Sequence, residues 1–117
     1  MNRLKFGKKA EKAVEKEYEK RGYKHIESNF HSRFGEIDII VCTDEYIVFA
    51  EVKARGEGML YLPAEAVNAS KQNKIRRTAE TYLYKNESGL QPRFDVCEVF
   101  VKDGKIDQIN IIENAFW

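Results

Sequence analysis

The pattern of hydrophobic and polar positions divides the chain into two helical and five strand-like segments. Apolar residues recur at helical spacing from Leu4 to Tyr18, and Gly22 follows, which predicts an amphipathic helix over residues 4–21. Pro63 suits the first turn of a second helix, predicted over residues 63–84. The predicted strands cover residues 23–32, 37–42, 46–52, 94–101 and 106–112. The order is therefore α-β-β-β-α-β-β.

The connections between these segments indicate how the strands pair. Two segments rich in β-branched residues flank Thr43-Asp44-Glu45 and are predicted to form a hairpin. Asp103-Gly104 is a suitable two-residue turn between the last two strands. The strand, helix, strand crossover between Val52 and Phe94 favours a parallel pair. The prediction is an α/β fold with a mixed sheet of about five strands and helices on its faces.

Charged residues occupy positions where the pattern calls for hydrophobic ones. Glu51 and Lys53 continue the apolar face of the 46–52 strand, and Asp38 lies on such a face in the preceding strand. Glu11 and Lys71 fall on the apolar stripes of the two helices. Buried charges are costly unless they are paired or bind a metal. Their convergence from four separate elements indicates a binding or catalytic pocket.

A structural explanation exists for each of these residues taken singly. Glu51 and Lys53 would form an ion pair at a strand end. Glu11 and Lys71 would extend their charged groups from the rim of the core. The site is favoured by the set of residues and not by any one of them.

The hairpin provides a geometric test of a shared metal. Asp38 and Glu51 project to the same side of the sheet if they are directly opposed. That register also pairs Thr43 with Tyr46 and leaves Asp44-Glu45 as a two-residue loop. A three-residue loop without a bulge would put the two carboxylates on opposite faces. We therefore expect the two-residue loop, or a bulge with the same effect.

Length and composition are those of a single globular domain over residues 1–117. The chain is 43% hydrophobic and 33% charged, and no apolar run approaches the roughly 20 residues that span a bilayer. The N-terminus has no apolar signal-peptide core. Cys42 and Cys97 lie in apolar strands, as expected of buried free thiols in a reducing compartment. We expect a cytoplasmic protein without membrane association.

The net charge of +1 conceals an uneven distribution. Residues 36–52 contain five acidic and no basic side chains, whereas residues 1–24 contain nine basic and four acidic ones. Residues 71–77 add four positive charges without an acidic residue. An acidic hairpin between basic helices would attract both a metal ion and the phosphates of a nucleic acid.

The residue types in the predicted pocket favour one chemistry over others. Carboxylates are hard oxygen ligands suited to Mg²⁺ or Mn²⁺, metals that often bind substrate phosphates. A neighbouring lysine stabilises charge that develops on a phosphate. Neither acyl transfer nor redox chemistry has a supporting pattern, and His25 and His31 are too few for a typical zinc site. Hydrolysis of a phosphodiester bond fits best.

Several motifs together resemble a known family. Asp38 followed after twelve residues by Glu51-Val52-Lys53 resembles the PD-(D/E)XK nuclease signature. Nearly the whole chain resembles the YraN-like family, mainly described as endonuclease-like proteins similar in fold to archaeal Holliday-junction resolvases. The segments that carry the resemblance are Gly35-Glu36-Ile37-Asp38-Ile39-Ile40, Val48-Phe49-Ala50-Glu51-Val52-Lys53-Ala54-Arg55, Pro63-Ala64-Glu65-Ala66-Val67 with Lys71, Arg93-Phe94-Asp95-Val96 and Glu113-Asn114-Ala115-Phe116.

This resemblance implies a restriction-endonuclease-like core and a role for each matching residue. Asp38 and Glu51 would be Mg²⁺ or Mn²⁺ ligands, with the carbonyl of Val52 as a third. Lys53 would be the catalytic lysine, and Glu11 the helix-borne acid that completes the site. Lys71 would face the scissile phosphate.

The expected function is metal-dependent cleavage of linear or branched DNA. Phosphate contacts are expected on the second helix, in the loop after the lysine and between the first two strands. The alternative is a non-catalytic nucleic-acid-binding or protein-interaction module that retains the nuclease fold. Leu60-Tyr61-Leu62 and Phe116-Trp117 are then the candidates for an exposed apolar patch or a homodimer interface. The predicted phosphate contacts are Arg33, Arg55, Lys71, Lys74, Arg76 and Arg77.

Overall fold

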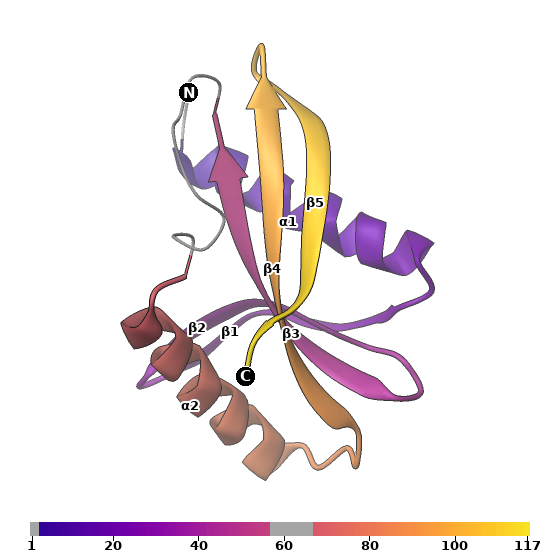
Figure 1. Ribbon diagram of the computed structural model, residues 1–117, viewed down its shortest axis with the longest axis vertical. Coiled ribbons are helices and arrows are strands. Elements are labelled where there is room, and N and C mark those ends of the chain that lie inside the picture. Colours follow the sequence, from indigo (N-terminus) through magenta and orange to yellow (C-terminus); the bar gives the residue numbers. More distant parts are fainter. Residues whose placement is uncertain (1–2, 57–66) are drawn as a thin grey trace.

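Five strands form one mixed sheet whose spatial order follows the chain order (Figure 1). The computed structural model describes residues 3–56 and 67–117. Strands β3 and β4 run parallel, and the other neighbours are antiparallel. The strands are β1 (Lys24–Ser32), β2 (Gly35–Cys42), β3 (Tyr46–Arg55), β4 (Gln91–Lys102) and β5 (Lys105–Phe116). The predicted α/β class, element order and mixed sheet are confirmed.

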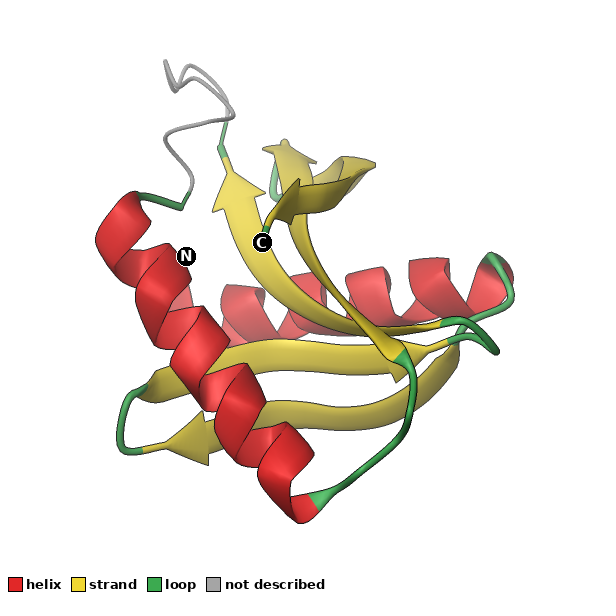
Figure 2. Ribbon diagram, turned by 60° about the horizontal axis from the view of Figure 1, so that its bottom comes forward, coloured by secondary structure: helices red, strands yellow, loops and turns green. Residues whose placement is uncertain are grey.

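Two helices cover opposite faces of this sheet (Figure 2). Helix α1 (Arg3–Lys20) precedes the first strand, and helix α2 (Ala69–Lys85) lies between β3 and β4. The end of one parallel strand and the start of the next lie at opposite ends of the strands, so a long crossover connection is required. Helix α2 belongs to that connection. The predicted placement of helices on the sheet faces is therefore confirmed.

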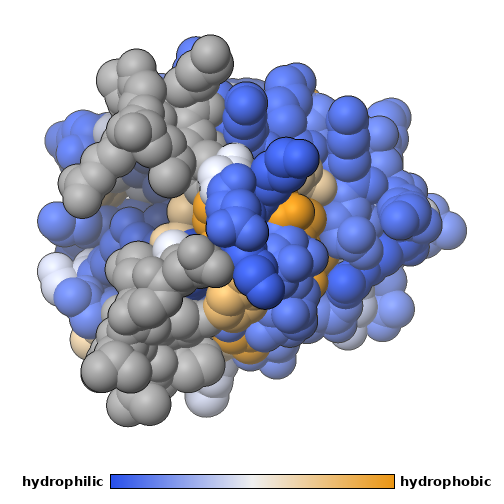
Figure 3. Space-filling view, turned by 90° about the horizontal axis from the view of Figure 1, so that it is seen from above, coloured by the Kyte–Doolittle hydropathy of each residue, from blue (hydrophilic) through white to orange (hydrophobic). Residues whose placement is uncertain are grey.

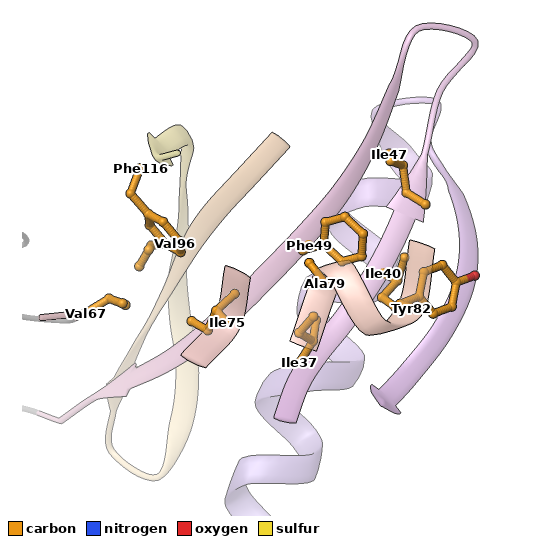
Figure 4. Close-up of a cluster of buried hydrophobic side chains, with 10 residues drawn as sticks. All are labelled: Ile37, Ile40, Ile47, Phe49, Val67, Ile75, Ala79, Tyr82, Val96 and Phe116. Atoms are coloured by element: carbon orange, nitrogen blue, oxygen red, sulfur yellow. The ribbon is translucent and has the colours of Figure 1, made fainter. Parts of the chain in front are cut away.

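The hydrophobic core on the α2 side joins that helix to the middle of the sheet (Figure 4). Phe49 on β3 and Phe30 on β1 both meet the ring of Tyr82, at centroid distances of 6.0 and 5.2 Å. Phe94 stacks between Phe49 and Phe116, at 5.7 and 5.0 Å. The buried members of this core are Ile37, Ile40, Ile47, Phe49, Val67, Ile75, Ala79, Tyr82, Val96 and Phe116.

A second core lies between α1 and the other face of the sheet. Val48 and Ala50 on β3 belong to it, whereas their neighbours Ile47 and Phe49 belong to the α2 side. Strand β3 is thus buried on both faces, as its continuous apolar run predicts. The buried members are Ala10, Val14, Tyr18, Ile39, Val41, Val48, Ala50, Cys97 and Val99.

Local backbone signals end the first helix and form the last turn as predicted. Gly22 has a φ of +93°, and its amide donates to Glu19 O, while the Tyr23 amide donates to Tyr18 O. This Schellman pattern carries its usual apolar contact, because the Tyr18 and Tyr23 rings lie 5.1 Å apart. Asp103 and Gly104 both have positive φ, as a tight two-residue turn requires.

Some sequence-based boundaries are wrong. Helix α2 begins at Ala69 and not at Pro63, because Asn68 caps it in an extended conformation. The part of that prediction over residues 57–66, including Leu60-Tyr61-Leu62, lies outside the described residues. Phe116 was predicted to belong to an exposed apolar patch, but it is buried in the α2-side core. Among the described residues of that predicted patch, Trp117 is the exposed one. Both cysteines are free, but Cys42 is only partly buried.

Where its residues are described, one face of the molecule is largely polar. Figure 3 shows a mainly hydrophilic face with a small hydrophobic area near its centre. Among the residues described, no helix has the length and apolar character needed to cross a membrane. The large hydrophobic side chains exposed on the described part of the chain are Ile26, Tyr84 and Trp117.

A buried polar network ties α1 to the end of the sheet. Asp95 on β4 is fully buried and accepts hydrogen bonds from the Tyr18 hydroxyl at 2.7 Å and the Asn114 amide at 3.0 Å. The Arg93 guanidinium donates two more to it, both at 2.9 Å, and a third to the Tyr23 hydroxyl at 2.8 Å. Each charge is therefore paired within hydrogen-bonding distance, as buried ions require.

Replacing Asp95 should destabilise the fold strongly. Asp95→Ala leaves the Arg93 charge without its main partner, and we expect a loss of about 3–5 kcal/mol in the free energy of unfolding. Urea denaturation followed by circular dichroism measures this change. Glu113→Ala is the control, because Glu113 is half-exposed and 3.9 Å from Arg93, and it should cost less than about 1 kcal/mol. Equal effects of the two variants would contradict the assigned role of the network.

Candidate functional site

The register of the β2–β3 hairpin brings two carboxylates to one place. Ile39 pairs with Ala50 and Cys42 with Ile47, and the Thr43 amide donates to Tyr46 O. This is the predicted register with a two-residue loop, and its continuation sets Asp38 against Glu51. Both carboxylates border one pocket of about 510 Å³, which we call the carboxylate pocket. Its lining consists of Gly35, Glu36, Asp38, Glu51, Asn68, Ser70, Lys71 and Lys74.

Asp38 lies in an environment that opposes its ionisation. Burial raises the pKa of Asp38 to about 7, and the negative charge of Glu51 adds to the rise. The Val52 amide opposes it by donating to Asp38 Oδ2 at 2.8 Å. The pocket therefore concentrates negative charge that a bound cation would relieve.

Glu51 is buried and shared between two lysines from different elements. Its Oε1 atom lies 2.7 Å from Lys71 Nζ on α2 and 3.4 Å from Lys53 Nζ on the same strand. The ion pair expected at the strand end is thus present, and Lys71 joins it. The sequence predicted these three residues, and the structure brings them together with Asp38.

The pKa values of the two lysines shift in opposite directions. Burial lowers the pKa of Lys53, and the adjacent Lys71 ammonium adds to this effect. Burial also acts to lower the pKa of Lys71, but its hydrogen bonds to Glu51 and Lys53 and the negative charges of Glu51 and Asp38 together raise it. Lys71 therefore holds its proton firmly as the direct partner of Glu51, while Lys53 carries the more readily lost proton.

The start of α2 positions Lys71 over the sheet. Asn68 caps the helix by accepting the Lys71 amide at 2.9 Å. Val67 and Ile75, four residues on either side of Lys71, are buried in the α2-side core. The helix is thus fixed at the point from which Lys71 reaches Glu51, and Lys74 follows one turn later on the pocket lining.

Glu11 approaches the site from α1 on the other face of the sheet. Its Oε1 accepts a hydrogen bond from the Asn29 side chain at 3.0 Å. Burial raises the pKa of Glu11, and the charges of Glu36 and Glu51 contribute. The described residues contain no group of three His, Cys, Asp or Glu side chains arranged to hold a metal ion. Glu11 as a third ligand therefore stays a prediction, as does the carbonyl of Val52.

The sequence analysis did not identify Asn29 or Asn68. Asn29 has a φ of +53°, lies between the residues paired as Ser28–Ile39 and Phe30–Ile37, and is thereby beside Asp38. An asparagine within a strand is unusual, and asparagine tolerates positive φ, so this position carried a usable signal. Asn68 is a good N-cap residue, but Pro63 also suits a first helical turn and led to the earlier predicted start.

The predicted phosphate-binding residues fall into four surroundings. Lys71 and Lys74 line the carboxylate pocket. Arg33 and Arg77 both contact the ring of Phe34, at 4.8 and 5.3 Å from its centroid. Arg76 binds the Trp117 carbonyl and lies over the Phe116 ring, and Arg55 lies largely buried 4.0 Å from Glu98.

Comparisons with known proteins identify many relatives. The family model described as "Uncharacterised protein family UPF0102" matches residues 10–99, a range that includes every residue of the predicted site. A UPF0102 protein of Caldanaerobacter subterraneus subsp. tengcongensis is 40% identical over 119 residues, covering 99% of this chain and 98% of the relative. One from Acetivibrio thermocellus is 42% identical over 121 residues, covering 98% and 93%. One from Alkaliphilus oremlandii is 46% identical over 99 residues, covering 82% and 84%.

Neutralising Asp38 should stabilise the metal-free protein at high pH. The pKa of Asp38 is about 7 in the folded state, above its ordinary value, so folding favours the protonated form. The contribution of Asp38 to stability should therefore fall as pH rises from about 4 to about 7 and stay low above that. Asp38→Asn, measured by urea denaturation in EDTA at pH 8, should gain about 1–2 kcal/mol, less than the full shift because water reaches the carboxyl group.

Asp44→Asn is the matched control for this measurement. Asp44 is exposed in the loop of the same hairpin. Its substitution should change the free energy of unfolding by less than about 0.5 kcal/mol at both pH 8 and pH 4. The gain from Asp38→Asn should vanish near pH 4. A variant less stable than the unaltered protein at pH 8 would disprove the unfavourable ionisation of Asp38.

Proposed function

The chain belongs to the uncharacterised protein family UPF0102, and we propose that it is a metal-dependent DNA endonuclease of the PD-(D/E)XK kind. The carboxylate pocket carries this proposal. Asp38 and Glu51 border one pocket, and Lys53 and Lys71 meet at Glu51 Oε1. The resemblance to the YraN-like family supports the same activity, including a preference for branched DNA.

The donor set of the pocket fits Mg²⁺ or Mn²⁺. Two carboxylates supply hard oxygen ligands, and such ions often bind through one or two carboxylates together with water and substrate phosphates. The raised pKa of Asp38 supports this fit, because a nearby positive charge would favour the ionised form. A bound ion would supply a water activated for attack and would neutralise charge on the phosphate.

The residues of the chain then have distinct roles in the reaction. In phosphodiester hydrolysis a water oxygen bonds to phosphorus, one ester bond breaks, and the departing oxygen takes up a proton. Asp38 and Glu51 would hold the ion, with Glu11 and the Val52 carbonyl as further ligands. Lys53 would donate a hydrogen bond to the phosphate as negative charge builds on it. Lys71 and Lys74 would hold the substrate phosphate at the pocket.

One observation also favours a non-catalytic nucleic-acid-binding module. Lys71 and Lys53 already neutralise Glu51 without a metal ion. A domain that has kept the fold and lost the reaction would show the same ion pairs. Metal binding and cleavage separate the two functions.

Cleavage assays test the proposed activity directly. Linear, single-stranded, flapped and four-way-junction DNA should be cut in the presence of Mn²⁺ or Mg²⁺. Asp38→Asn and Lys53→Ala should each lower the rate by at least about a hundredfold while leaving the circular dichroism spectrum unchanged. Lys105→Ala, at the exposed start of β5, is the control and should cut normally. Activity that survives both site variants would overturn the proposal.

Calorimetry with Mn²⁺ tests the ligand assignment without relying on activity. The unaltered protein should bind the ion, and Asp38→Asn should lose most of that binding. Lys71→Met removes the ammonium that competes for Glu51 Oε1, so the affinity should rise about tenfold, or about 1.4 kcal/mol. Absence of binding heat in the unaltered protein would favour the non-catalytic module. Weaker binding in Lys71→Met would show that Lys71 does not compete with the ion.

A further inference from the structure

A second concave surface lies on the outer side of α2, apart from the carboxylate pocket. It has a volume of about 600 Å³, and its lining shares no residue with that pocket. We call it the α2 groove. It is lined by Phe34, Asn73, Arg76, Arg77, Glu80, Thr81, Tyr84 and Lys85.

Phe34 is fixed at the groove by the turn between β1 and β2. Its amide donates to Ser32 Oγ at 3.1 Å, and that hydroxyl bonds to Thr78 Oγ1 on α2 at 2.9 Å. The guanidinium groups of Arg33 and Arg77 both lie within cation–π distance of its ring. One aromatic ring thus holds two positive charges beside the groove.

Tyr84 adds a free aromatic surface to the same groove. Tyr84 is 92% exposed. Removing such an apolar surface from water is normally favourable. An exposed aromatic ring beside guanidinium groups is the arrangement on which nucleic-acid bases stack while the backbone contacts the cations. Glu80 is the acidic residue among the lining, and Arg76, Arg77 and Lys85 leave the groove positive.

The α2 groove lies further along the same helix than the carboxylate pocket. Lys74 lines the pocket and Arg77 lines the groove, one helical turn further on. Tyr84 follows about 15 Å beyond Lys74 along the helix axis. A strand of a few nucleotides held at the pocket would therefore reach the groove.

We propose that the α2 groove binds a single-stranded stretch of nucleic acid beside the scissile phosphate. A base stacks on Tyr84, and backbone phosphates contact Arg77 and Arg33. Bases in an intact duplex are stacked on one another and cannot reach this ring, so the groove selects substrates with an unpaired segment. This inference rests on the proposed function in one respect only, that the strand continues to the carboxylate pocket.

Binding measured without metal tests the groove independently of cleavage. Fluorescence anisotropy in EDTA would compare a labelled 12-nucleotide oligothymidine with a duplex of the same length. Tyr84→Ala should weaken binding of the single strand about 5- to 30-fold, and binding of the duplex less than twofold. Tyr84→Phe keeps the ring and should restore single-strand binding. Trp117→Ala removes an equally exposed aromatic residue outside the groove lining and should have no effect.

Arg77→Ala tests the phosphate contact. It should weaken single-strand binding and reduce the slope of log K against log salt by about 0.7, the value for one contact to a single strand. Equal losses for single strand and duplex in Tyr84→Ala, no loss in either, or no saturable binding by the unaltered protein would overturn the inference. A groove adapted to another protein would give one of the last two results.

The two proposals can fail separately. Single-strand binding that depends on Tyr84, in a protein that does not cut DNA, would leave the groove in place and remove the nuclease. Cleavage that depends on Asp38 and Lys53, without an effect of Tyr84→Ala on single-strand binding, would remove the groove and leave the nuclease.

Discussion

The register of the β2–β3 hairpin is the constraint on which the rest of the structure depends. With Ile39 opposite Ala50, the two strands send one set of side chains to the α1 side and the other to the α2 side. The same register sets Asp38 against Glu51. A slip of one residue would exchange the faces of every side chain on one strand. The two cores and the carboxylate pocket are therefore specified together, and selection for a stable core also maintains the geometry of the pocket.

The pocket is assembled from elements that are packed independently. The sheet supplies Asp38 and Glu51, and α2 supplies Lys71 at a position flanked by buried residues on the same helical stripe. A carboxylate buried in a sheet needs a partner, and the lysine of the crossover helix meets that need. The neutralisation of Glu51 thus depends on how α2 packs on the sheet. Substitutions in the α2-side core would therefore alter the ion pair between Lys71 and Glu51.

Local patterns predicted the elements and part of the site, and long-range contacts explain the remainder. The apolar run of β3, the glycine after α1 and the even loop after Thr43 each act within a few residues, so the sequence reveals them. The Tyr18–Asp95 hydrogen bond joins residues 77 positions apart and has no local signature. Arg55 was predicted to face DNA, yet its side chain lies largely buried near Glu98, because a charge in a strand does not reveal which neighbour it will meet. Glu11 was correctly placed on an inward helix face, but its contact with Asn29 depends on a backbone irregularity in β1.

The hydrogen bond from Tyr18 to Asp95 has a consequence for the order in which the molecule assembles. Helix α1 is made early in synthesis, but the strand that receives its buried hydroxyl comes late, and β4 must in turn pair with both β3 and β5. Strands β2 and β3 supply much of the cover for the apolar side of α1, but the Tyr18 hydroxyl lacks its buried partner until β4 is made. Such non-local topology slows folding and leaves a partly made chain prone to association.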